Sequence, residues 1–297
     1  MKPREFFINA ADYGMPTRDE LVSYRIWDTH FHGFLSRSPV NPIAQFNQNS
    51  FYVERMGIER SISLDVGGTL DKPVDESPYD GEIRAILERD KDHLSGLTPI
   101  DQGHPDRSCA KIEKWVRDGP CIGIKYVAGN WSGHTCSHPD NDPIIRLAAE
   151  LNALIYIDSW LVVGGNPRRP GGGNVPGENT PMDVVKLAQR FPEVTFICGH
   201  SGGDWELGAR IVRPHRNVYF EFAGSDPHSG SVDYAVKELG VDRIVWGGHG
   251  PSRSYATELG KILDSDLSRE DRMKILGGNY RRLAAPVFQR KGQKIVQ

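Results

Sequence analysis

The sequence contains few cysteines and no long apolar run, and both absences narrow the classes of protein that it can encode. Its 297 residues include only four cysteines, scattered without a CxxC pair. This spacing argues against a disulfide framework and against a thiolate zinc site. No segment approaches the ~18 consecutive apolar residues of a membrane helix, and the first thirty residues contain no signal-peptide core. We therefore expect reduced thiols, a cytoplasmic location and no membrane partner.

An excess of charge of either sign is also missing. The chain has 36 Lys and Arg against 39 Asp and Glu, a net charge of −3, and no basic stretch long enough to follow a phosphate backbone. Nucleic acid is therefore excluded as a partner. Hydrophobic residues make up 38% and charged residues 25% of the chain, a balance typical of a globular protein with a large core and the size of an enzyme domain. We expect its partner to be a small-molecule substrate.

The sequence does contain a regular alternation of short apolar runs and amphipathic stretches. Eight runs rich in Val, Ile and aromatic residues lie at 25–32, 60–68, 94–100, 121–127, 154–160, 194–200, 218–224 and 243–249. Stretches with helical spacing of apolar residues separate them, and the weakest of these, 204–215, should end early at Pro214. This pattern, without GxGxxG after the first strand, favours an α/β fold, a (β/α)8 TIM barrel. We expect one domain over 1–297, with 1–24 as an N-terminal extension.

Two expected loops are longer than the usual connection between a strand and the next helix. They cover 128–141 and 161–179, follow strand carboxyl ends, and therefore should lie on the catalytic face of the barrel. Arg168 and Arg169 in the second loop suit a carboxylate substrate. His134, Cys136 and His138 in the first loop are metal-ligating residue types, but we expect that they bind no metal.

Polar residues with catalytic potential stand where the expected strands end. His30 and His32 are two residues apart, a spacing that points both imidazoles to the same side of a strand, where they can share one cation. Later strands end in further polar residues: Lys125, Asp158, His200 and His249, with Arg253 shortly after the last strand. The carboxyl ends of barrel strands face one cavity. We therefore expect these side chains to converge.

The segments WDTHFHG, GIKYV, ICGHSGGDW, VWGGHGP and LGGNYRRL together resemble the amidohydrolase superfamily, and they are most similar to its amidohydrolase-related (amidohydrolase 2) branch. The resemblance runs from Asp28 to about Ala285. It implies a barrel hydrolase or decarboxylase, often with zinc or manganese. Similar proteins carry the HxH pair, one His after strand five, one His after strand six and one Asp after strand eight. In this chain Asp158 stands at the strand-five position and His249 at the strand-eight position, so the His and Asp are exchanged.

The exchange preserves a potential metal site but removes the general base that the resemblance implies. His30, His32, Asp158 and His249 still supply three imidazoles and one carboxylate for one divalent ion, with zinc preferred and manganese as the alternative. His200 is expected to be a further ligand or to polarise the substrate carbonyl. We expect Asp158 or His249 to act as the base in place of the missing Asp.

Lys125 stands where some members of the superfamily use a carboxylated lysine to bridge two metals. Such sites also use paired histidines from strands five and six, and Asp158 breaks that pair, so we expect a single metal. Lys125 should then pair with a substrate carboxylate or with Asp158. Arg253, Arg168 and Arg169 are the other expected substrate contacts.

The preferred function at this point is metal-dependent hydrolysis of a C–N or C–O bond in a small amide, lactone or ester that bears a carboxylate. One alternative is non-oxidative decarboxylation of a small unsaturated or aromatic acid on the same metal site. Two others are a metal-free lactonase and a non-catalytic barrel that kept only a ligand pocket. Barrels of this kind often pair, so a homodimer is one option for the assembly.

Overall fold

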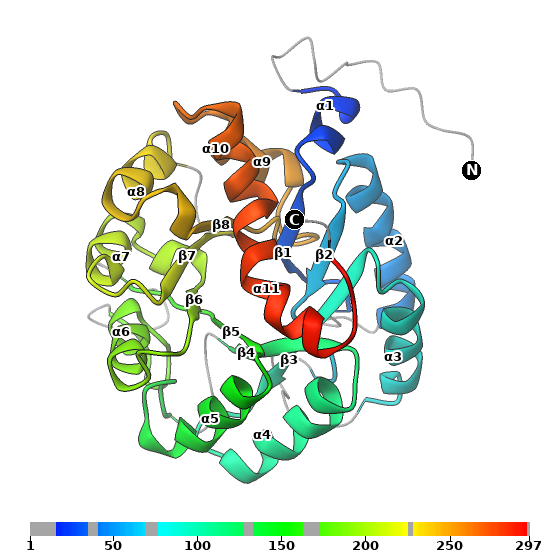
Figure 1. Ribbon diagram of the computed structural model, residues 1–297, viewed down its shortest axis with the longest axis vertical. Coiled ribbons are helices and arrows are strands. Elements are labelled where there is room, and N and C mark those ends of the chain that lie inside the picture. Colours follow the sequence, from blue (N-terminus) through cyan, green and yellow to red (C-terminus); the bar gives the residue numbers. More distant parts are fainter. Residues whose placement is uncertain are drawn as a thin grey trace.

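The computed structural model describes residues 16–34, 41–68, 77–127, 133–162, 173–224 and 228–295. Its eight parallel strands form one sheet in the order β1 to β8, wound around the centre of the molecule (Figure 1). The strands are β1 (Trp27–Phe31), β2 (Arg60–Ser63), β3 (Leu94–Ile100), β4 (Cys121–Tyr126), β5 (Leu154–Ile157), β6 (Phe196–Cys198), β7 (Val218–Phe222) and β8 (Ile244–Trp246). The expected (β/α)8 barrel is confirmed.

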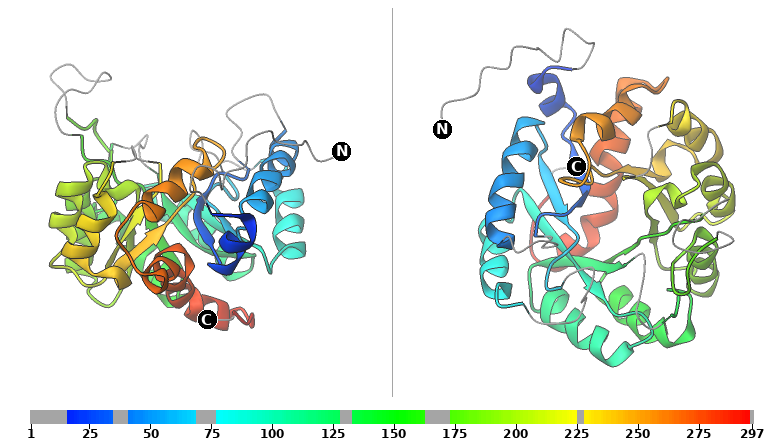
Figure 2. Two further views of the ribbon diagram at one scale, coloured as in Figure 1. Left: turned by 90° about the horizontal axis from the view of Figure 1, so that it is seen from above. Right: turned by 180° about the vertical axis from the view of Figure 1, so that it is seen from behind.

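Most helices follow the strands in sequence and form a ring outside them, whereas α1 precedes β1 and α11 crosses one end of the barrel (Figures 1 and 2). They are α1 (Arg18–Ser23), α2 (Pro42–Arg55), α3 (Asp80–Arg89), α4 (Pro105–Ile112), α5 (Asp142–Glu150), α6 (Pro181–Arg190), α7 (Trp205–Val212), α8 (Ser231–Leu239), α9 (Tyr255–Leu263), α10 (Arg269–Met273) and α11 (Asn279–Arg290). A π-helical segment, η2 (Glu113–Arg117), extends α4. None of the helices in the described ranges is long and apolar enough to cross a membrane.

Local sequence explains where these helices begin and end. At α6, Thr180 and Asp183 form a capping box and Pro181 occupies the first turn, where its missing N–H costs no hydrogen bond. The weakest of the expected helices, in 204–215, corresponds to α7. It begins after Asp204, whose side chain accepts a hydrogen bond from the N–H of Leu207. It ends at Val212, two residues before Pro214, as the sequence predicts.

Side chains help to close the barrel between β8 and β1. Backbone ladders join each strand to the next from β1 to β8. Across the remaining seam, the Asp28 carboxylate accepts hydrogen bonds from Gly248 N (2.6 Å) and from the Tyr255 hydroxyl (2.9 Å). The Thr29 hydroxyl donates to the Trp246 carbonyl at 2.8 Å. The seam thus connects the strand that carries His30 to the strand that precedes His249.

The amino end of the barrel is plugged, which leaves the opposite end for function. Residues inside the barrel and residues of α11 form one buried apolar cluster, namely Trp27, Ile62, Leu64, Leu97, Ile122, Leu154, Tyr156, Ile197, Val245, Tyr280, Ala284, Val287 and Phe288. Helix α11 crosses the centre of the barrel in Figure 1. A larger apolar cluster fills the space between the strands and the outer helices. Close packing of both layers holds the strand carboxyl ends in place.

The expected flanking segments lie only partly within the described residues. Residues 1–15 of the N-terminal extension are outside them, whereas 18–23 form α1. In the two long loops, 128–132 and 163–172 are outside the described residues, so the positions of Arg168 and Arg169 are not described.

Candidate metal centre

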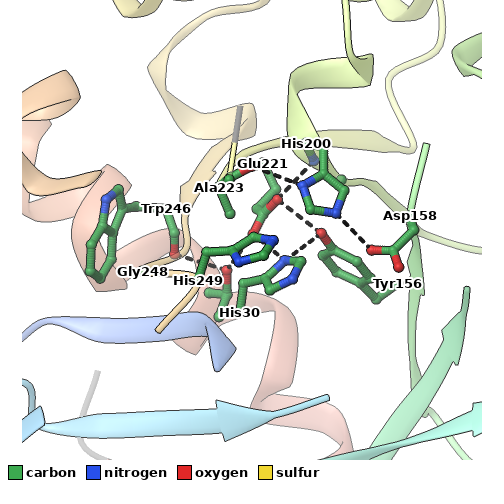
Figure 3. A network of polar contacts seen from close by, with 12 residues as sticks. His30, Tyr156, Asp158, His200, Glu221, Ala223, Trp246, Gly248 and His249 are labelled. Atoms are coloured by element: carbon green, nitrogen blue, oxygen red, sulfur yellow. Dashed lines mark hydrogen bonds and ion pairs between the residues drawn. The ribbon is translucent and has the colours of Figure 1, made fainter. Parts of the chain in front are cut away.

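Four histidines meet at the carboxyl end of the barrel, together with Asp158 and Lys125. Figure 3 shows three of them, His30, His200 and His249, with Asp158. The ring centroid of His30 lies 4.9 Å from that of His32, 4.8 Å from that of His200 and 4.3 Å from that of His249. Ligand atoms of His30, His200 and His249 all lie within 4.8 Å of one another. The fold therefore brings together side chains that are far apart in the sequence. Their roles as ligands or catalytic groups remain predictions.

Glycines and unusual backbone angles make room for this cluster. A Cβ atom on Gly224 would stand 2.1 Å from Cδ2 of His249, and one on Gly247 would stand 2.5 Å from Cβ of His30. His200 and His249 have φ angles of 56° and 51°, in the left-handed region that non-glycine residues rarely adopt. Strained residues of this kind persist where the surrounding structure holds a side chain for function.

His30 and His32 both use Nδ1 to contact a hydrogen-bond acceptor. The Tyr156 hydroxyl donates to Glu221 at 3.0 Å, so its oxygen accepts from His30 Nδ1 at 2.8 Å. His32 Nδ1 lies 2.9 Å from Oδ2 of Asp65. In metal sites, a second residue that accepts from Nδ1 orients each histidine in the same way and turns its Nε2 toward the ion.

The Nε2 atoms of His30 and His32 face each other at short range. They lie 3.1 Å apart, a separation that either a shared proton or a cation between the two nitrogens can bridge. Two imidazoles bound to one ion at ~2.0–2.1 Å would have their nitrogens about 2.8–3.0 Å apart in octahedral geometry and about 3.3–3.4 Å apart in tetrahedral geometry. The pair therefore fits a divalent ion.

His249 has the same arrangement of its ring nitrogens. The Ser252 hydroxyl donates to the His249 carbonyl at 3.0 Å, so its oxygen accepts from Nδ1 of the His249 ring. The lone pair of His249 is again on Nε2. Burial, together with the neighbouring imidazoles, lowers the pKa of His249 and that of His30, which keeps both rings neutral and able to donate to a metal.

His200 differs from the other three histidines because both of its nitrogens contact acceptors. Nδ1 lies 2.9 Å from the Ala223 carbonyl oxygen, and Nε2 lies 3.1 Å from Oδ1 of Asp158. Burial opposes a charge on His200, but the hydrogen bond and the charge of Asp158 outweigh it and raise the pKa of His200. The surroundings of His200 therefore favour its doubly protonated form, the imidazolium.

Asp158 is shared between two cations. Its Oδ2 lies 3.1 Å from Lys125 Nζ, while Oδ1 contacts His200. Burial alone would raise the pKa of Asp158, but the Lys125 charge and the His200 hydrogen bond hold it below its ordinary value. Lys125 thus has one of the two partners that the sequence suggests, and both oxygens of Asp158 are engaged.

The fold also adds three residues to the centre that sequence reasoning missed. These are Asp65 after β2, Tyr156 in β5 and Glu221 in β7, and all three are buried. Burial raises the pKa of Glu221 to about 7, although the His200 charge and N–H and the Tyr156 hydroxyl oppose this. One signal in the sequence could have identified Glu221: it is a glutamate within the apolar strand VYFEF, and a buried carboxyl requires polar partners.

Other candidate residues lie away from this cluster. Arg253 is exposed, and its Nη1 donates to the Ser252 carbonyl at 3.1 Å. The rings of His134 and His138 stack with centroids 3.9 Å apart and, with Asp140, form a second group of metal-ligating types. Cys136 is fully buried and is not in that group.

The chain is similar in fold to several solved enzymes. One is 5-carboxyvanillate decarboxylase from Sphingomonas paucimobilis (TM-score 0.64, 12% identity, covering 88% of this chain and 99% of that chain). Another is 4-oxalomesaconate hydratase from Rhodopseudomonas palustris (TM-score 0.64, 16% identity, covering 90% of this chain and 98% of that chain). A third is dihydroxybenzoic acid decarboxylase from Polaromonas sp. JS666, solved with bound manganese and the inhibitor 2-nitroresorcinol (TM-score 0.60, 15% identity, covering 88% of this chain and 95% of that chain). At these identities the likeness shows the fold alone.

A search of curated protein sequences found no significant match. The sequence profile of the amidohydrolase family, in contrast, matches residues 27–283, which contain every strand of the barrel and all four histidines of the centre. The chain belongs to the amidohydrolase family.

Proposed function

We propose that the protein is a metal-dependent decarboxylase of a small unsaturated or aromatic carboxylic acid. The observation that carries this proposal is the His200–Asp158–Lys125 chain, whose contacts favour a protonated imidazole beside the histidine cluster. A decarboxylase needs a proton donor for the carbon that loses carbon dioxide, and an imidazolium can supply that proton. Two of the three similar structures named above are decarboxylases, which supports the same choice.

His30, His32 and His249 are the residues that we expect to hold the ion. Each places Nδ1 against a hydrogen-bond acceptor, which leaves Nε2 for the ion. A divalent ion held there would bind substrate oxygen atoms and stabilise the negative charge that develops as the C–C bond breaks. Three imidazoles favour zinc over manganese, which prefers carboxylate oxygens. Manganese is the alternative ion, because the Polaromonas enzyme was solved with bound manganese.

The proposed reaction assigns one proton transfer to His200. The bond between the substrate carbon and its carboxylate breaks, carbon dioxide leaves, and the electron pair stays on the carbon. The proton that His200 Nε2 shares with Asp158 is then transferred to that carbon, and His200 later regains one from solvent. Asp158 stabilises the charged form of His200, and Lys125 holds Asp158 in place. Overall, one carboxylate and one proton give one carbon dioxide and one C–H bond.

Hydrolysis, which the sequence alone favoured, is the weaker candidate. It requires a group that accepts a proton from water, and the carboxylates beside the described histidines are occupied. Both oxygens of Asp158 contact cations, and Asp65 accepts from His32. Glu221 is fully buried and accepts hydrogen bonds from Tyr156 and from the backbone of His200. His249 remains the candidate base if the reaction is hydrolytic.

The proposal is tested by a panel of substrates on metal-loaded protein. Hydroxybenzoates and other small unsaturated acids should release carbon dioxide, and in deuterated water the product should carry one deuteron at the carbon that lost it. Aryl esters and lactones of similar size should release no acid. Ester or lactone turnover without carbon dioxide release would instead support hydrolysis.

Two variants separate the expected ligands from the expected proton donor. His200→Gln should keep the metal and lose turnover by at least about 100-fold, the usual scale of an acid catalyst. His30→Asn should lose the metal itself, as measured by elemental analysis after dialysis. Loss of the metal from His200→Gln would show that His200 is a ligand and would remove it as the proton donor.

A further inference from the structure

A tryptophan that the proposed reaction does not use stands beside the proposed proton donor. The ring centroid of Trp160 lies 5.7 Å from that of His200, and the two ring planes meet at 66°. Trp160 follows β5, two residues after Asp158, so it lies at the carboxyl end of the barrel with the other residues of the centre.

Exposure singles out the part of the centre that a substrate can reach. Within the His200–Asp158–Lys125 chain, the side chain of His200 is 10% exposed, against 5% for Asp158 and 1% for Lys125. The rings of Trp160 and His249 both contact that of His200, and both residues are partly exposed. A substrate at His200 is therefore flanked by the imidazole of His249, which we expect to hold the metal, and by the indole of Trp160.

The backbone ties Trp160 to the turn that carries His200. Trp160 N donates to the Asn179 carbonyl at 2.7 Å, and the next residue, Leu161, donates its N–H at 2.7 Å to the carbonyl of Gly202. Gly202 belongs to the short 3-10 turn that begins at His200. These bonds limit the positions open to the indole, and a surface that is fixed before binding loses little entropy when a ligand contacts it.

An indole that is held in this way suits an aromatic ring better than an aliphatic group of the same size. Contact between two aromatic rings strengthens binding about two- to tenfold beyond what the buried area alone gives. A planar ring can lie against Trp160 while the carbon that loses carbon dioxide faces His200. Tyr156 also contacts the histidines, through His30, but it is fully buried and offers no such surface.

We propose that Trp160 determines specificity: its indole contacts the ring of the substrate, so the site takes aromatic acids in preference to open-chain unsaturated ones. This inference rests on the proposed function, because it requires the substrate to react beside His200. It narrows the substrate class, since an open-chain acid has no ring to use this surface.

The test compares benzoate with cyclohexanecarboxylate, two acids of similar size of which one is aromatic, by calorimetric titration of the metal-loaded protein. The wild type should bind benzoate about three- to tenfold more tightly. Trp160→Leu should keep its metal and bind the two acids equally, whereas Trp160→Phe should retain most of the preference because it keeps an aromatic face. Trp205→Leu is the matched control, because Trp205 is also partly exposed but its ring contacts His228 rather than His200; it should bind as the wild type does.

The outcomes separate this inference from the proposed reaction. A wild type without the benzoate preference, or an equal preference in Trp160→Leu, would overturn the inference. A loss in Trp160→Phe as complete as that in Trp160→Leu would also overturn it, because it would show a role in packing alone. If the wild type released no carbon dioxide, the proposed decarboxylation would fail, but a benzoate preference lost in Trp160→Leu and kept in Trp160→Phe would still support the indole as the surface that binds the ring.

Discussion

Replacement of Tyr156 by Phe tests the claim that hydrogen bonds behind the histidines prepare them for a metal. The Tyr156 hydroxyl accepts from His30 Nδ1 at 2.8 Å and donates to Glu221 at 3.0 Å. Removing it takes away the acceptor that keeps the His30 proton on Nδ1. Loss of such a partner typically weakens metal binding 10–100-fold.

The surrounding contacts place the expected loss near the lower end of that range. Oε1 of Glu221 lies 3.3 Å from His30 Nδ1, so it can replace part of the lost interaction. We therefore expect zinc binding to weaken about tenfold, or ~1.4 kcal/mol. The phenylalanine ring keeps the packing of Tyr156, so the fold itself should persist.

The assay is competition for zinc against a chromogenic chelator at pH 7.5, with thermal unfolding measured in parallel. Tyr126→Phe is the matched control: Tyr126 is also a fully buried strand tyrosine, and its hydroxyl has no hydrogen-bond partner among the described residues. Zinc affinity in Tyr156→Phe within twofold of the wild type would refute the reasoning, as would an equal loss in Tyr126→Phe.

Two further predictions concern stability. Burial lowers the pKa of Lys111 to about 7, and its Nζ has no hydrogen-bond partner in the described ranges. Below pH 7 the folded protein bears the full cost of this buried charge, and the cost fades as pH rises toward the unfolded value of ~10.5. Lys111→Met should therefore raise the free energy of unfolding by roughly 1–3 kcal/mol at pH 6 and by much less at pH 9.5, measured by urea denaturation; an equal gain at both pH values would contradict this. Asp28→Ala removes the acceptor of Gly248 N–H and Tyr255 hydroxyl bonds across the barrel seam. It should lower the free energy of unfolding by roughly 2–3 kcal/mol, and an unchanged urea midpoint would show that the seam does not depend on it.

Much of the barrel could be predicted from the sequence because its signals are local. Runs such as CIGIKYV and VYFEFAG are apolar on both faces, as strands must be when an interior core and a helix layer cover them. Pro214 ends α7 for a reason that involves only its own ring and backbone. The HxH spacing likewise reports a strand that presents two imidazoles to one side.

The partners behind the histidines could not be predicted in the same way. Tyr156 and Glu221 lie within apolar strands, where a sequence pattern cannot distinguish a core residue from one that orients a ligand. The choice of Lys125 between a substrate and Asp158 also depends on a distance across the barrel. Such contacts join residues that are remote in the chain, and local periodicity carries no information about them.

The sequence by itself determined the order of strands and helices, the position of His30 and His32 at a strand end, and the family to which the chain belongs. These properties follow from local periodicity and from short motifs. Only the tertiary structure decided that His200 is held between two acceptors, while His30 and His32 each place Nδ1 against an acceptor and turn Nε2 toward each other. The physical reason is that protonation depends on burial and on neighbours, and closure of the barrel brings those neighbours together.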